Sequence, residues 1–119
     1  MKKTLVIGAS ENPERYSNMA VRLLRKNAHE VIAFGIRAAV IDDVPIITNF
    51  PSHADIDTVT LYLNPAAQRE YYDHILSLRP KRIIFNPGTE NPEFEEMATS
   101  HQIETIEACT LVMLNTGQY

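Results

Sequence analysis

The sequence is poor in the residues that cross-link a chain, anchor it in a membrane or bind nucleic acid. Cys109 is its one cysteine, so no disulfide can form within it, and the reducing cytoplasm is the expected location. Its apolar runs last only a few residues, whereas a membrane-crossing helix needs about 20. Its 11 Lys and Arg residues are scattered and are outnumbered by 15 Asp and Glu residues. Binding to DNA or RNA needs clustered positive charge, so neither a membrane nor a nucleic-acid partner is expected.

Short apolar runs alternate with segments of helical period along the chain. Strands are predicted at 4–7, 31–34, 58–63, 83–85 and 105–108, and helices at 17–27, 65–79, 92–101 and 110–114. The stretch 36–53 is predicted to be irregular, with a short strand at 45–47. Asparagine followed by proline at 64–65 and at 91–92 is typical of a helix start, and Thr110 is expected to cap the last helix.

This alternation predicts the fold class. Strands that alternate with helices are joined by right-handed crossovers, so the sheet is expected to be mostly parallel and covered on both faces. The prediction is a three-layer, doubly wound, Rossmann-like α/β domain that spans residues 1–119, a length typical of one domain. Ligands bind such sheets beyond the carboxyl ends of the strands, where the winding direction reverses.

The loop after the first strand is the first candidate for a ligand site. A dinucleotide fingerprint has three glycines, G-x-G-x-x-G, but only Gly8 is present here, with Ser10 and Pro13 at the other two positions. The following helix carries no acid in its first turn, so its free amides and dipole favour an anion, assisted by Arg15. The alternative is a plain surface loop in which Ser17 caps its helix.

The end of the second strand bears on the identity of the nucleotide. A dinucleotide fold places an acid there for a free ribose diol, or an arginine for a ribose phosphate. This chain has Gly35 and Arg37 there and no acid before Asp42. The pattern disfavours NAD and suits coenzyme A and NADP equally. A solvated surface arginine is the alternative.

With these loops the chain resembles the small stand-alone CoA-binding proteins, relatives of the CoA-binding domain of succinyl-CoA synthetase. The resemblance rests on 6–10 (VIGAS), on Arg15 and the Ser-Asn pair at 17–18, on the turn at 86–88 (NPG) and on Cys109. It implies that the first loop and helix start hold CoA phosphates, and that the later turns flank adenosine and pantetheine. The chain departs from the family after the second strand, where it has FGIR at 34–37 and an Asn-Pro pair is usual, and at 86–88, where Gln and Gly are usual.

The loops at the strand ends and the family resemblance together give the expected binding residues. They are Gly8, Ala9, Ser10, Arg15, Tyr16, Ser17, Asn18, Gly35, Arg37, Leu63, Asn64, Asn86, Pro87, Gly88 and Cys109. The expected function is a non-catalytic module that binds coenzyme A or an acyl-CoA as a carrier, sensor or regulatory subunit. The alternatives are a minimal NADP-dependent oxidoreductase and an interaction module that has lost its ligand. The sequence neither predicts nor excludes a protein partner or a homo-oligomer.

No catalytic set or metal site is expected. Cys109 precedes a helix start that lowers a thiol pKa, but a small buried filler is the alternative. Glu90 is interpreted either as a base at the binding edge or as a surface acid. The histidines, at 29, 53, 74 and 101, show no metal-ligand spacing.

Overall fold

The computed structural model describes residues 1–52 and 55–119, so His53 lies outside the described residues. The strands are β1 (Thr4–Ile7), β2 (Val31–Phe34), β3 (Ala39–Ile41), β4 (Val44–Ile47), β5 (Thr58–Leu61), β6 (Arg82–Phe85) and β7 (Glu104–Glu107). The helices are α1 (Tyr16–Lys26), α2 (Pro65–Gln68), the 3-10 turn η1 (Arg69–Tyr71), α3 (Tyr72–Leu78), α4 (Pro92–Ser100) and α5 (Thr110–Asn115). Within these ranges no helix has the length and apolar content needed to cross a membrane.

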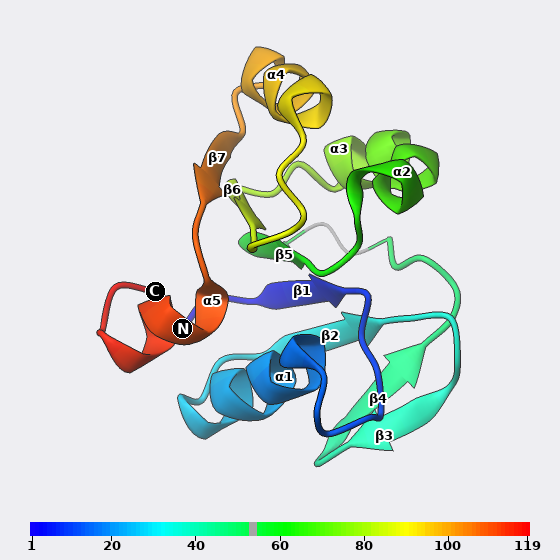
Figure 1. Cartoon of the computed structure of the whole chain (residues 1–119), viewed down its shortest axis with the longest axis vertical. Helices are drawn as coiled ribbons and strands as arrows, with labels where there is room; N and C mark the ends of the chain where they lie inside the picture. The colour runs from blue at the N-terminus through cyan, green and yellow to red at the C-terminus, as the bar shows by residue number, and fades with distance from the viewer. Residues whose placement is uncertain (53–54) are drawn as a thin grey trace.

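One sheet organises the molecule, with the strand order β3-β4-β2-β1-β5-β6-β7. All neighbouring strands are parallel except β3, which pairs antiparallel with β4. The winding starts at β1 in the middle and moves through β2 to the hairpin of β3 and β4 at one edge, then returns to β5 and moves outward to β7 (Figure 1). The reversal therefore falls between β1 and β5, and the predicted Rossmann-like class is confirmed.

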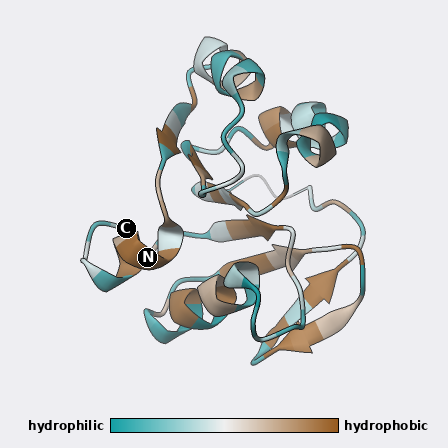
Figure 2. Cartoon of the chain, in the orientation of Figure 1, coloured by the Kyte–Doolittle hydropathy of each residue, from teal (hydrophilic) through white to brown (hydrophobic). Residues whose placement is uncertain are grey.

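Alternating side chains of the strands pack into two cores, one on each face. On one face Leu5, Ile7 and Phe85 pack with α3 and α4 residues such as Ile75 and Phe94. On the other face Val6 and Ala33 pack with Val21 and Leu24 of α1. Figure 2 shows β2 and β4 mostly in hydrophobic colours, whereas the helices mix both kinds of residue. Burial on both faces explains why the strands are continuous apolar runs.

The predicted boundaries are wrong in four places. The strand predicted at 45–47 is confirmed as part of β4, but the stretch 36–53 also contains β3, which forms a hairpin with β4 because Asp42 adopts a positive φ of 52° that lets the chain reverse at once. The helix predicted at 65–79 is divided at η1, where Tyr71 leaves the helical region with φ −108° and ψ 1°. Thr110 is the first residue of α5 and not its cap, which is Cys109. The strand predicted at 58–63 ends at Leu61.

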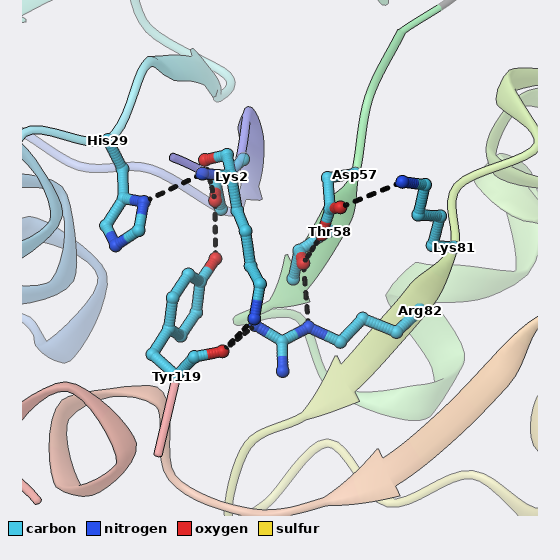
Figure 3. A network of polar contacts seen from close by, with 8 residues as sticks. Lys2, His29, Asp57, Thr58, Lys81, Arg82 and Tyr119 are labelled. Carbon is cyan, nitrogen blue, oxygen red and sulfur yellow. Dashed lines mark hydrogen bonds and ion pairs between the residues drawn. The ribbon is translucent and has the colours of Figure 1, made fainter. Parts of the chain in front are cut away.

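A polar cluster fastens the amino edge of the sheet, the edge opposite to the expected ligand site (Figure 3). The Tyr119 hydroxyl and the Thr4 hydroxyl are hydrogen-bonded, and the Tyr119 carbonyl oxygen accepts from Lys2 Nζ and from Arg82. The Arg82 guanidinium lies 4.4 Å from the centre of the Tyr119 ring, and His29 meets that ring edge-on at 4.9 Å. His29 Nδ1 accepts the Lys2 backbone N–H at 3.0 Å, so the imidazole is held neutral.

This arrangement predicts a pH dependence of folding stability that comes from His29. Burial, followed by nearby positive charges that include Lys2 and Arg82, lowers its pKa below the usual value of about 6.5. The unfolded chain then binds more protons than the folded one between the two pKa values, so this stability is complete above the unfolded pKa and is lost as pH falls. We expect the free energy of urea unfolding to drop less between pH 7.5 and about pH 5 in His29→Gln than in the wild type.

The exposed His101 supplies the control, because His101→Gln changes the same residue type at a position whose ring is hydrogen-bonded to the Met97 carbonyl oxygen of its own helix. Parallel pH profiles for the wild type and His29→Gln would rule out His29 as the source.

Candidate functional site

Gly8 brings the carboxyl ends of three strands together. The Gly8 and Ala9 amides both donate to the Phe34 carbonyl oxygen at 3.0 Å, which ties the end of β1 to the end of β2. Gly8 has a φ of +93°, and a Cβ on it would lie 2.9 Å from the Tyr62 carbonyl oxygen after β5. A Cβ on Gly35 would lie 2.4 Å from the Ala9 carbonyl oxygen. Glycine is required at both positions, because any larger residue would push these backbones apart.

A cleft of about 710 Å³ opens above this junction, at the carboxyl ends of β1, β2 and β5. This volume is within the range of small-molecule sites. Its lining residues fall into three groups: the first loop with the start of α1, the segment after β2, and the turns after β5 and β6. They are Gly8, Ala9, Ser10, Glu11, Asn12, Arg15, Tyr16, Ser17, Phe34, Gly35, Ile36, Arg37, Tyr62, Leu63, Asn64, Tyr71, Pro87, Gly88 and Thr89.

Free amides line the first wall of the cleft. The loop is folded on itself, since Asn12 N–H donates to Ser10 Oγ and Arg15 N–H donates to the Asn12 carbonyl oxygen. Among the described residues, no acceptor meets the amides of Ser10, Glu11, Tyr16 and Ser17. Helix α1 has no side-chain cap and no acid in its first turn. These donors and the positive end of the helix dipole form a corner that could hold an anion.

Two arginines beside this corner are not neutralised. Arg15 and Arg37 line the cleft, and neither forms an ion pair within the part of the chain that the structure describes. Arg25 differs, since it pairs with Asp43 at 2.8 Å. The acid lining this end is Glu11, which is exposed and therefore screened by water.

Aromatic rings form the second wall. Phe34 and Tyr71 line the cleft with ring centres 5.3 Å apart, and Phe50 packs against both at 5.1 and 5.8 Å. Burial raises the pKa of Tyr71, followed by a smaller effect of Glu70, so this phenol stays neutral. Tyr16 and Ile36, 69% and 93% exposed, stand at the mouth. A planar base can stack against such a surface.

The third wall is the turn of Pro87, Gly88 and Thr89. Its position is fixed from behind by the buried Gln68 side chain, which donates to the carbonyl oxygens of Leu63 and Thr89 at 2.9 and 2.8 Å. The exposed Glu90 carboxylate accepts the Gly88 N–H at 2.9 Å.

Twelve of the fifteen predicted site residues line the cleft, and Asn18, Asn86 and Cys109 do not. Asn86 is buried and donates to Thr60 Oγ1 at 2.7 Å while its Oδ1 accepts the Thr110 N–H at 2.9 Å, so it joins β5, β6 and α5. Asn18 donates to the Ser10 carbonyl oxygen at 3.0 Å and supports the loop from behind. Cys109 is the N-cap residue of α5 and is partly buried.

Sequence reasoning missed several lining residues. They are Glu11, Asn12, Phe34, Ile36, Tyr62, Tyr71 and Thr89. All but Asn12 and Tyr71 are direct chain neighbours of predicted site residues, so including those neighbours would have found them. Tyr71 has no local signal, because it reaches the cleft only through the break at η1. Among residues 1–52 and 55–119, no group of three His, Cys, Asp or Glu converges as a metal site would.

The sequence model of a family described as "CoA binding domain" matches residues 2–115. The chain belongs to the CoA-binding domain family. The resemblance stated from the first loop is thus confirmed, and the family match covers all three walls of the cleft.

Solved structures share the fold of this CoA-binding domain along its whole length. The crystal structure of an uncharacterized protein is 46% identical, with a TM-score of 0.97, and the match covers 100% of this chain and 98% of the other. The structure of cell-free ID.343 from Thermus thermophilus is 20% identical with a TM-score of 0.86, over 99% and 90% of the two chains. A hypothetical protein from Pyrococcus horikoshii OT3 is 21% identical with a TM-score of 0.86, over 97% and 82%. No curated protein matches the chain.

The strand junction predicts different costs for the same substitution at two glycines. Gly8 and Gly88 have nearly equal φ values of +93° and +92°, but only at Gly8 would a Cβ meet backbone atoms. Gly88→Ala should cost about 1–2 kcal/mol for its left-handed backbone alone. Gly8→Ala should cost about 1–3 kcal/mol more, because the ends of β1 and β5 must separate. Urea unfolding of both variants measures this, and equal losses would contradict the role given to Gly8.

Proposed function

We propose that the cleft binds coenzyme A or an acyl-CoA, and that the domain is a non-catalytic carrier, sensor or regulatory subunit of the cytoplasm. The proposal covers residues 1–119 as one CoA-binding domain. The observation that carries it is the set of unpaired amides at 10–11 and 16–17, beside the unpaired Arg15. A diphosphate would supply the missing acceptors and the missing negative charge together. The single thiol suits a reducing compartment.

The three walls suggest an orientation for the ligand. The diphosphate would lie on the amides near Ser10 and Ser17, where the helix dipole is strongest. The ribose phosphate would meet Arg37, and the adenine ring would lie against Phe34 and Tyr71, which are the aromatic surface of the cleft. The uncharged pantetheine arm would then run past 63–64 toward the turn at 87–89.

NADP is the second candidate, because it also carries a ribose phosphate for Arg37 and suits a sheet of this strand order. The first loop speaks against it. Seven residues, 9–15, separate Gly8 from the start of α1, where dinucleotide sites use a tight glycine turn. An interaction module that binds neither ligand would leave the unpaired donors of the first loop without a use.

A thermal-shift panel separates these functions. CoA, dephospho-CoA, NADP, NAD and AMP would each be added to the purified chain, and melting would be followed by circular dichroism. A ligand at a hundred times its Kd adds roughly 2.7 kcal/mol to the free energy of unfolding. We expect CoA to raise the melting temperature more than the other four compounds. A shift with NADP and none with CoA would favour the oxidoreductase, and no shift at all would favour the interaction module.

Substitution of the two free arginines tests the orientation. Arg15→Ala should weaken CoA and dephospho-CoA alike, by about tenfold, because a charge-assisted hydrogen bond to the shared diphosphate is lost. Arg37→Ala should weaken CoA but leave dephospho-CoA nearly unchanged, because the latter lacks the ribose phosphate. Isothermal titration calorimetry gives both affinities.

Lys26→Ala is the matched control, since Lys26 carries the same charge at the opposite end of α1. Equal affinity of Arg15→Ala and wild type for CoA would remove Arg15 from the site.

A further inference from the structure

Gln68, the last residue of α2, is a polar side chain that is fully buried behind the third wall of the cleft. Burial of an amide is unfavourable unless its polar atoms find partners. Here Nε2 donates to the Leu63 and Thr89 carbonyl oxygens at 2.9 and 2.8 Å, and Oε1 accepts from Asn91 Nδ2 at 2.9 Å. All three hydrogen bonds of this side chain therefore end on the segments that follow β5 and β6.

Asn91 determines the orientation of the Gln68 amide. Asn91 Oδ1 accepts the Phe94 N–H at the start of α4, so its Nδ2 group is the one that faces Gln68 and Tyr72. Gln68 must present its oxygen to this donor, which turns its Nε2 group toward the two carbonyl oxygens. The opposite orientation would place donor against donor and acceptor against acceptor.

The Gln68 amide continues a connection that the sheet does not supply. The ladder between β5 and β6 ends with the pair Leu61 and Phe85. Beyond this pair, no backbone hydrogen bond within the described residues joins 62–64 to 86–90. Gln68 bridges these two segments through Leu63 and Thr89, and both of these residues line the cleft.

We propose that Gln68 is a positioning residue for the pantetheine arm of the ligand, because its bridge fixes the spacing between 63–64 and 87–89. The proposal rests on the proposed function, which takes the arm to lie along these segments. Gln68 does not itself line the cleft, so it acts through Leu63 and Thr89. The nucleotide end depends on other contacts, since Tyr71 of the aromatic wall packs against Phe34 and Phe50. Loss of the bridge should therefore weaken binding of the arm and spare binding of the nucleotide.

The experiment compares two ligands that share the nucleotide end. CoA and 3′-phospho-ADP, which has the same nucleotide and diphosphate but no pantetheine, would be titrated into the wild type and Gln68→Met by isothermal titration calorimetry. Methionine is about as long as glutamine but cannot donate, so the side-chain volume is kept and the bridge is lost. We expect CoA affinity to fall about threefold to tenfold, the usual effect of a lost hydrogen bond, and 3′-phospho-ADP affinity to fall less than about twofold.

Two further variants complete the design, and circular dichroism shows whether each is folded. Gln68→Glu keeps the shape of the side chain but has no N–H, so it should change the two affinities in the same unequal way and serves if Gln68→Met does not fold. Tyr72→Phe is the matched control. It removes a hydroxyl that contacts Asn91 and Glu93 in the same network but leaves the bridge in place, so the ratio of the two affinities should stay at the wild-type value.

The outcomes separate this inference from the proposed function. Equal losses for both ligands, or CoA affinity that neither Gln68 variant lowers, would overturn the positioning role while CoA binding stands. A wild type that binds 3′-phospho-ADP as tightly as CoA would also overturn it, because the arm would then add no affinity. Absence of CoA binding by the wild type would overturn the function and the inference together.

Discussion

The close approach of three backbones at Gly8 is the constraint on which the ligand site depends. Two amides share the Phe34 carbonyl oxygen, and no side chain separates Gly8 from the Tyr62 carbonyl oxygen. This contact joins the ends of β1 and β5 at the floor of the cleft. The loops that follow β1, β2 and β5 therefore start from one point and diverge as the walls of a single cleft.

The two edges of the sheet differ in how their polar groups are used. At the carboxyl edge, amides of the first loop and two arginines face the open cleft without a protein partner among the described residues. At the amino edge the polar groups satisfy one another, as Tyr119 shows by contacting Thr4, His29 and Arg82. The amino edge is thus held together by contacts between distant parts of the chain, and the carboxyl edge keeps its donors available to a ligand.

The sequence was informative wherever one residue determines the local backbone. Glycine after the first strand, and Asn64 and Asn91 before prolines, correctly marked a strand end and two helix starts, where both asparagines accept an amide of the first turn. The sequence was misleading where one residue type can either face a ligand or form hydrogen bonds inside the fold. Asn86 follows a strand at the binding edge, but its amide is consumed by Thr60 and Thr110 inside the fold. The aromatic wall was not predictable, since Phe50 and Tyr71 meet Phe34 only through tertiary packing.

The first loop also explains how an anion corner can exist without the glycine fingerprint. Glycines in that fingerprint let the backbone come close to a phosphate. Here side chains hold the backbone open instead, because Ser10 Oγ, Asn12 Oδ1 and Asn18 Nδ2 bond to groups within 10–14 and leave other amides free. The donors then come from two places, the loop at 10–11 and the helix start at 16–17, with Arg15 at the cap between them.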